Sequence, residues 1–231
     1  MRFEEIFGWK SIGDSLFTDG ASTLIINSHR FERAISVTGY KDRDLVLDIG
    51  SYPGFGLHFF KNYIATGLLP KEYIDKLNTH SIKNFTLNIE EEGFECDADL
   101  ILFQEVIEHI RRPAFALKNI VSSLKPGARL YITTNNIYYY GYLIKLILGK
   151  RIYDDIQSEF DIYPGHHRYY ALEELVDTLT GLGLRIDSAE HINLLPPVKF
   201  YNRRSLGIIK WLFSKITPKR YSSHIEILAV K

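Results

Sequence analysis

Residues 44–56 read Asp-Leu-Val-Leu-Asp-Ile-Gly-Ser-Tyr-Pro-Gly-Phe-Gly, and this stretch decides the fold. Its apolar run is short and stops at Gly50, which predicts a buried strand. Gly54 and Gly56 follow, before a helix-compatible Leu-His-Phe-Phe at 57–60. Small residues at a strand-to-helix turn let the backbone approach a ligand closely. The free backbone N–H groups at the N-terminus of the following helix can then bind an anionic group. A tight turn that binds nothing is the alternative interpretation.

Further strands and helices alternate after this stretch. The apolar runs at 99–103, 128–134 and 224–230 predict strands, the last of them near a sheet edge because its first residues alternate with polar ones. Helices are predicted over 113–124 and 172–182, where apolar residues recur on one face. This alternation predicts an α/β fold, with a doubly wound, mostly parallel sheet covered by helices on both faces.

The composition indicates a globular domain without a strong charge preference. The chain has 231 residues, of which 45% are hydrophobic, and its 28 basic residues balance 28 acidic ones. Zero net charge excludes a globally basic nucleic-acid binder, so no DNA partner is expected. The lone Cys96 excludes an intrachain disulfide. No signal peptide or run of 18 apolar residues is recognisable, which favours a cytoplasmic location.

Four sequence blocks, in order, carry a resemblance to a known family. They are residues 45–56, 99–113, 124–135 and 166–186, within a span of roughly 44–230. Together they resemble the class I S-adenosylmethionine-dependent methyltransferases. The resemblance implies a Rossmann-like, seven-stranded sheet, S-adenosylmethionine as the cofactor, and methyl transfer as the reaction.

The same resemblance implies a set of cofactor-binding residues. The loop residues Gly50, Ser51, Gly54 and Gly56 would line the methionine moiety, with Asp48 holding the loop or the amino group. Asn88 would contact the adenine and Gln104 the sulfonium region. One departure is visible: the family usually has an acidic residue at the end of its second strand, but the corresponding stretch ends at Thr66-Gly67. The nearest acidic residues, Glu72 and Asp75, come later.

Glu105, Glu108 and His109 form a Glu-x-x-Glu-His cluster. On a helix, this spacing would place all three side chains on one face. With His166 they form a candidate site for a divalent metal, because carboxylates and imidazole are suitable ligands. The cluster is similar to that of ubiquinone-type O-methyltransferases and of small-RNA 3′-end ribose methyltransferases. The alternative is metal-free, with His109 or His166 as the catalytic base.

Two further segments are expected to cover the acceptor. Residues 135–165 form a tyrosine-rich insertion within a methyltransferase domain at 44–231, and residues 1–43 form an N-terminal helical extension or lid. Ligands of open α/β sheets bind at the carboxyl ends of the strands, where this insertion begins. Tyrosines suit a sugar or aromatic acceptor. A packed helical subdomain without a ligand role is the alternative.

Residues 199–220 contain seven basic residues and no acidic one, interleaved with apolar residues. The simpler interpretation is a core helix with a solvated basic face. The alternative is an amphipathic helix in peripheral contact with an anionic membrane or a phosphate-bearing substrate.

The expected function is O-methylation of a small-molecule or sugar/glycan acceptor. The sugar is favoured because the Glu-His and His-x-Arg-x-Tyr motifs are similar to those of methyltransferases of polysaccharide pathways. An RNA ribose methyltransferase and a non-catalytic methyltransferase-fold binding protein are the alternatives.

Overall fold

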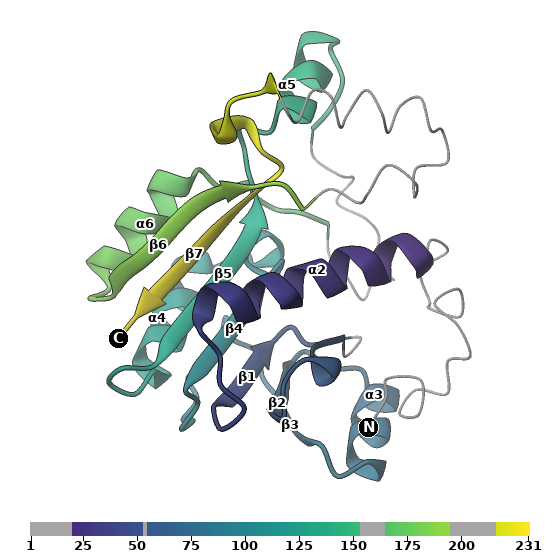
Figure 1. Cartoon of the computed structure of the whole chain (residues 1–231), viewed down its shortest axis with the longest axis vertical. Helices are drawn as coiled ribbons and strands as arrows, with labels where there is room; N and C mark the ends of the chain where they lie inside the picture. The colour runs from purple at the N-terminus through teal and green to yellow at the C-terminus, as the bar shows by residue number, and fades with distance from the viewer. Residues whose placement is uncertain (1–19, 53–54, 153–164, 195–215) are drawn as a thin grey trace.

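One sheet organises the molecule. The computed structural model describes residues 20–52, 55–152, 165–194 and 216–231 (Figure 1). Among these residues, seven strands lie in the order β3-β2-β1-β4-β5-β7-β6. The strands are β1 Leu45–Ile49, β2 Asn62–Gly67, β3 Lys83–Thr86, β4 Leu100–Gln104, β5 Arg129–Asn135, β6 Arg185–Ile192 and β7 His224–Val230. The helices are α2 Gly20–Thr38, α3 Lys71–Thr79, α4 Pro113–Ser123, α5 Tyr140–Ile147 and α6 Leu172–Gly181, with 3₁₀ turns η2 Phe55–His58, η3 Ile107–His109 and η5 Lys219–Tyr221.

The predicted doubly wound, mostly parallel sheet is confirmed. The strand at 224–230 was expected near a sheet edge, and β7 is the second strand from one edge, where it lies between β5 and β6 and pairs antiparallel with both. Its polar residue Glu226 does not face water, because it is buried and paired with other side chains. The edge strand is β6, whose residues are mostly half-buried or exposed.

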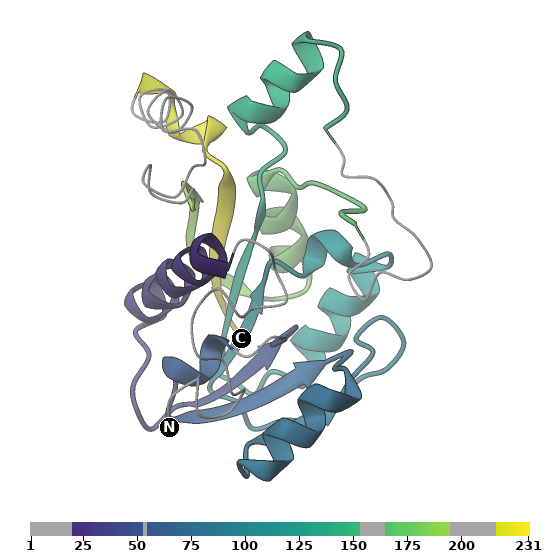
Figure 2. The same cartoon turned by 90° about the vertical axis from the view of Figure 1, so that its right-hand side faces the viewer.

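Helices cover both faces of the sheet, as predicted. On one face, buried residues of α4 and α6, such as Leu117 and Leu179, pack against β4 and β5. On the other face, α2 and α3 contribute residues such as Phe31 and Leu77 to a second cluster. Figure 2 shows α4 and α6 on the opposite side of the sheet from α2.

The connection from β1 to β2 is short. Where the sequence allowed a helix, the described residues contain only the four-residue 3₁₀ turn η2. Phe31 of α2 packs directly on the residues that follow, with ring centroids 5.4 Å from Phe59 and 6.0 Å from Phe60. Helix α2 therefore lies against the segment that leaves the glycine loop.

A buried carboxylate fastens α2 to the sheet. Glu226 of β7 is 1% exposed and accepts two hydrogen bonds from Arg33 of α2, each 2.7 Å long. The hydroxyl of Tyr131 on β5 donates a third, 2.5 Å long. A bidentate arginine–carboxylate pair fixes both distance and orientation. These contacts hold α2 across the middle of the sheet, as Figure 1 shows.

Replacing Arg33 with methionine should lower the free energy of unfolding by roughly 2 kcal/mol, because a buried carboxylate loses its counter-charge. This loss is smaller than for a fully buried pair, because 36% of the Arg33 side chain is exposed to water that screens its charge. Chemical denaturation measures it. The control, Lys61→Met, breaks an exposed ion pair with Asp42 and should change stability little. Equal losses in both variants would contradict a special role for the Glu226 contacts.

Candidate active site

Parallel strands bring the predicted residues Asp48 and Gln104 to one edge of the sheet, together with Asn135, which was not predicted. Asp48 lies near the end of β1, Gln104 ends β4, and Asn135 ends β5. Strands β1, β4 and β5 are parallel neighbours, so their carboxyl ends meet at this edge. We call it the carboxyl edge.

Two of the loop glycines are required by packing within the protein. Gly50 has φ +80°, and a Cβ atom there would collide with the side chain of Val106. A Cβ at Gly56 would lie 2.8 Å from the Asp48 carboxylate oxygen Oδ2. Ser51, which follows Gly50, is buried. Gly54 lies outside the described residues.

Asp48 is buried behind the loop. Its carboxylate accepts a hydrogen bond of 2.6 Å from the Tyr63 hydroxyl on β2. Burial raises the pKa of Asp48 to about 6, although the hydrogen bond from Tyr63 and the positive charge of Arg30 act to lower it. This carboxyl group therefore changes its charge close to neutral pH.

Gln104 and Arg30 present buried polar atoms that no group among the described residues satisfies. Gln104 is 4% exposed, and neither its side-chain nitrogen nor its oxygen has a hydrogen-bond partner. The Nε atom of Arg30, on α2, is also buried without a partner. Such groups are rare in folded proteins because each unmade hydrogen bond is costly. Their presence at this edge indicates a place for a polar ligand.

Arg30 was missed by the sequence analysis. It lies in the N-terminal region that the family blocks do not cover, and no local pattern distinguishes it from the other basic residues there. Its charge lowers the pKa of both Asp48 and Glu105, which places the guanidinium near the ends of β1 and β4. Only the packing of α2 on the sheet reveals this position.

Glu105 and Glu108 point to different neighbours. The short turn η3 replaces the helix that would have aligned them, and Glu105 adopts φ 55°, a left-handed conformation that is strained for this residue. Glu105 pairs with His224 across 3.2 Å. Glu108 instead accepts hydrogen bonds from the Thr134 hydroxyl at 2.7 Å and the Asn135 amide at 3.1 Å.

The pKa values of these two carboxyl groups shift in opposite directions. Burial and the negative charge of Glu105 raise the pKa of Glu108. Burial acts in the same way on Glu105, but the charge and hydrogen bond of His224 outweigh it and bring the pKa of Glu105 below its ordinary value. One carboxylate is therefore held ionised beside one that favours its proton.

His109 and His166 lie together, which confirms that these distant residues converge. Their ring centroids are 4.7 Å apart in an edge-to-face arrangement. His166 Nδ1 lies 3.3 Å from the Tyr169 hydroxyl. Ligand atoms of Glu108, His109 and His166 all fall within 4.8 Å of one another, a grouping that does not include Glu105.

Aromatic side chains connect this pair to the insertion. Tyr142 of α5 stacks on Tyr169 with centroids 4.6 Å apart. The Tyr142 hydroxyl donates to the side-chain oxygen of Asn135 at 3.1 Å, and Asn135 in turn donates to Glu108. Helix α5 and the segment around His166 are thus joined to the carboxyl edge by one network.

The end of β2 lacks a carboxylate, as the sequence indicated. β2 ends at Gly67 and is followed by Leu68, which is 71% exposed. Glu72 lies on α3, where it pairs with Lys76 at 3.1 Å and is largely exposed. Asn88 follows β3, and its side-chain oxygen accepts a hydrogen bond of 3.2 Å from the backbone of Glu90.

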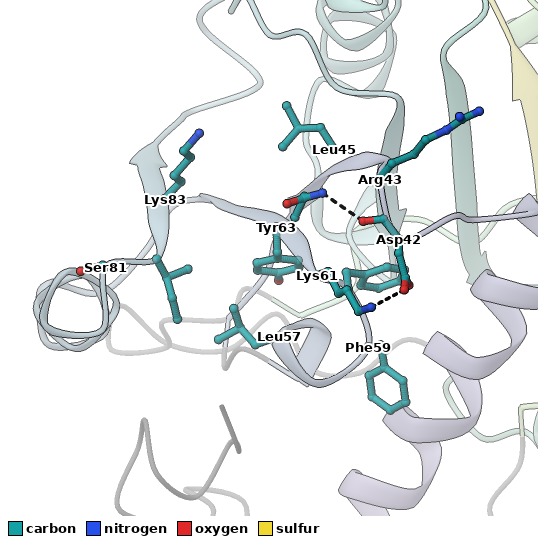
Figure 3. Close-up of a pocket in the computed structure, with 12 residues that line it drawn as sticks. Asp42, Arg43, Leu45, Leu57, Phe59, Lys61, Tyr63, Ser81 and Lys83 are labelled. Carbon is teal, nitrogen blue, oxygen red and sulfur yellow. Dashed lines mark hydrogen bonds and ion pairs between the residues drawn. The ribbon is translucent and has the colours of Figure 1, made fainter.

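A separate cavity of about 700 Å³ opens at the opposite edge of the sheet. It is bordered by residues at the amino ends of β1, β2 and β3, including Arg43, Lys61 and Lys83 (Figure 3). Lys61 and the Asn62 side chain both bond to Asp42 there. This cavity is distant from Gln104 and from the histidine pair, because they lie beyond the other ends of the strands.

Comparison with known proteins identifies the family. Residues 28–189 match the model of a methyltransferase domain family. The chain belongs to this methyltransferase family. It is an S-adenosylmethionine-dependent methyltransferase, as the resemblance implied. A search of curated proteins finds no match.

Solved structures share the methyltransferase's fold at low sequence identity. A SAM-dependent methyltransferase from Archaeoglobus fulgidus has a TM-score of 0.61 and 17% identity, covering 88% of this chain and 94% of that one. A methyltransferase in complex with the Trm112 activator of Haloferax volcanii gives 0.61 and 16%, with 92% and 94% covered. Coclaurine N-methyltransferase, bound to N-methylheliamine and SAH, gives 0.61 and 14%, with 96% and 74% covered. At these identities the likeness establishes the fold.

Asp48→Asn should remove a pH dependence of stability. The pKa of Asp48 is about 6 in the folded protein against an ordinary 3.8, so the folded state binds this proton more tightly than the unfolded chain. The resulting stability is complete below about pH 3.8 and is lost as the pH rises through about 6. Relative to the variant, the parent should lose roughly 3 kcal/mol between about pH 4 and pH 7.

Urea denaturation of the cofactor-free protein at several pH values measures this loss. Asp75→Asn is the control, because it makes the same chemical change at an exposed position on α3. A parent and an Asp48 variant with parallel stability–pH curves would show that the carboxyl group is not perturbed.

Proposed function

We propose that this methyltransferase transfers the methyl group of S-adenosylmethionine to a hydroxyl oxygen of a small-molecule or sugar acceptor. The observation that carries the proposal is the His109–His166 pair, 4.7 Å apart at the carboxyl edge and bordered by stacked tyrosines. A hydroxyl must lose its proton as the new bond to carbon forms. An imidazole accepts a proton near neutral pH, so either histidine can act as the base.

The described residues fit the methionine part of the cofactor. That part carries a carboxylate and an ammonium group, and the site offers Arg30 beside Asp48 and Glu105. The unsatisfied amide of Gln104 supplies a donor and an acceptor between them. When bound, the cofactor supplies an electrophilic methyl group. The chain orients it and aligns the acceptor for in-line displacement.

We assign the acceptor side to the tyrosines of the insertion. Tyr139, Tyr142 and Tyr169 form a cluster of ring contacts beside the histidines. Such faces stack on sugar or aromatic rings, while their hydroxyls offer hydrogen bonds. The described part of the 135–165 insertion, which includes α5, leaves the carboxyl end of β5. This position supports the lid role; residues 153–164 lie outside the described residues.

A divalent metal at Glu108, His109 and His166 is the second candidate feature of the site. Their ligand atoms lie close enough to share an ion. Both Glu108 oxygens, however, already accept hydrogen bonds from Thr134 and Asn135, and Glu105 pairs with His224 instead. Because these carboxylates already have partners, a metal-free histidine base is favoured over a metal site.

A methyl-transfer screen with labelled cofactor tests the acceptor class. The screen tests four classes of acceptor: nucleotide sugars, lipid-linked sugars, quinol precursors and short RNAs. Label in the sugar arms supports the proposal, whereas label in RNA alone would favour the ribose methyltransferase. Failure to bind either S-adenosylmethionine or S-adenosylhomocysteine in calorimetry would favour a non-catalytic binding protein.

Gln104→Met should weaken cofactor binding by roughly tenfold without destabilising the cofactor-free protein. The substitution removes polar atoms that have no hydrogen-bond partner among the described residues, so no hydrogen bond within that part of the chain is lost. Calorimetry measures affinity and thermal melting measures stability. Asn119→Leu is the contrasting control, since Asn119 donates to two backbone carbonyls and its loss should lower stability alone. Unchanged affinity in the Gln104 variant would remove Gln104 from the site.

Substituting the catalytic base with glutamine, at His109 or His166, should lower kcat by at least about a hundredfold and abolish the rise of kcat with pH. A chelator should leave the parent's activity intact if the base is metal-free, and abolish it if a metal is required. His80→Gln, at the end of α3, is the control. A parent-like pH profile in both site variants would contradict the assignment.

A further inference from the structure

We propose that α5 and residues 216–221 form a docking surface for an anionic lipid bilayer. The surface combines exposed apolar side chains with basic ones and lies next to the carboxyl edge. The lipid contact itself is independent of the proposed function. Its consequence for the acceptor, given below, rests on that function.

Helix α5 exposes apolar side chains that a core helix would bury. None of its residues is buried. Ile147 is 84% exposed, and Ile144 and the adjoining Leu148 are also exposed. These three residues have the i, i+3, i+4 spacing that places them on one face of the helical turn. Contiguous apolar exposure of this kind marks an interaction surface.

The C-terminal segment extends the same surface. The guanidinium of Arg220 lies over the ring of Tyr138, 4.7 Å from its centroid, which joins residues 216–221 to the chain entering α5. Ile216 is exposed there as well. Figure 1 shows η5 close to α5. Two segments distant in sequence thus contribute apolar side chains to one region.

The charge of this surface identifies the partner. Residues 135–152 contain Lys145, Lys150 and Arg151 and no acidic residue, and residues 216–221 add Lys219 and Arg220. Among the described residues, Glu173 of α6 reaches this region, 3.6 Å from Arg220. Apolar residues bordered by basic ones are the composition of helices that lie in the interface of anionic membranes. Each basic residue near such a surface adds to the attraction.

The length of α5 favours contact with the membrane surface over spanning of the bilayer. Helix α5 has eight residues, about 12 Å at the usual rise, which is far less than a bilayer core. No helix among the described residues is long and apolar enough to cross a membrane. The apolar face would enter the headgroup boundary while the basic residues meet lipid phosphates.

This position connects the membrane to the acceptor site. Tyr142, on the same helix, contacts Asn135 and Tyr169 beside the histidine pair. An acceptor whose polar head is carried on a lipid would therefore reach the site from the docked bilayer. A lipid-linked sugar is the acceptor class that satisfies both the aromatic site and the docking surface.

Co-sedimentation of the full chain with vesicles tests the proposal. Binding to vesicles of phosphatidylcholine plus phosphatidylglycerol should exceed binding to phosphatidylcholine alone by at least about tenfold, and should weaken as salt increases. Lys145→Glu with Lys150→Glu should reduce binding by roughly tenfold or more. Ile147→Ser should reduce it by roughly fivefold, because one apolar side chain no longer enters the interface.

Matched controls distinguish the proposed docking surface from effects of net charge or of exposed apolar side chains elsewhere on the protein. Arg43→Glu with Lys83→Glu makes the same change in net charge at the opposite edge of the sheet (Figure 3). Leu68→Ser removes a similarly exposed apolar side chain at the end of β2, which β1 and β4 separate from β5. Both controls should bind vesicles like the parent.

Several outcomes would overturn the proposal. These are no binding to anionic vesicles at low salt, equal losses in the two charge-reversed pairs, or parent-like binding by Ile147→Ser. Loss only in Lys210→Glu with Lys215→Glu would assign the contact to residues 199–220 without α5. A change of oligomeric state in the α5 variants, with vesicle binding intact, would identify a second copy of the chain as the occupant.

Calorimetry with the cofactor keeps the two proposals apart. The docking variants should bind S-adenosylmethionine like the parent and should methylate a water-soluble acceptor at the parent rate. A parent that binds anionic vesicles but not the cofactor would refute the proposed function while leaving the docking surface in place.

Discussion

The buried carboxylate of Glu226 is the constraint on which the site depends. It is buried on β7, where an unpaired charge would be strongly destabilising, and it is compensated by Arg33 from α2 and by Tyr131 from β5. Because Arg33 is reached only when α2 lies across the sheet, the pairing specifies where this helix packs. The same placement directs Arg30, one turn earlier, toward the carboxyl edge.

Polar groups at the carboxyl edge divide into two neighbouring sets. One combines Gln104 and Arg30 with the carboxylates of Asp48 and Glu105, and it contains polar atoms without a hydrogen-bond partner in the part of the chain that the structure describes. The other centres on the histidine pair and is internally connected through Asn135, Tyr142 and Tyr169. The first set suits a zwitterionic ligand, and the second suits proton transfer. Their adjacency is what a group-transfer reaction between two substrates requires.

The two edges of the sheet differ in character. At the amino ends of the strands, the lysine and arginine side chains border an open cavity and the ion pair there is exposed. At the carboxyl ends, charged groups are buried and their pKa values are shifted. Exposed apolar side chains gather beyond this second edge, on α5. Chemistry and the docking surface therefore lie on the same side of the molecule.

The sequence by itself determined the fold class, the positions of four strands and two helices, and the glycine loop. Short apolar runs identified the buried strands β1, β4 and β5, and the order of motifs identified the family. Proximity of His109 and His166 also followed, since parallel strands deliver their ends to one edge. The sequence also showed that no carboxylate directly follows β2.

Only the tertiary structure decided the rest. The divergence of Glu105 from Glu108 depends on a left-handed backbone at Glu105 and on His224, which arrives from β7. The burial of Glu226 on β7 depends on its ion pair with Arg33 of α2, which a polarity pattern interprets as exposure. Arg30 enters the site because α2 packs on the sheet. The apolar face of α5 is exposed because the core leaves it uncovered. Each of these outcomes is set by contacts between residues distant in sequence, and local periodicity contains no information about such partners.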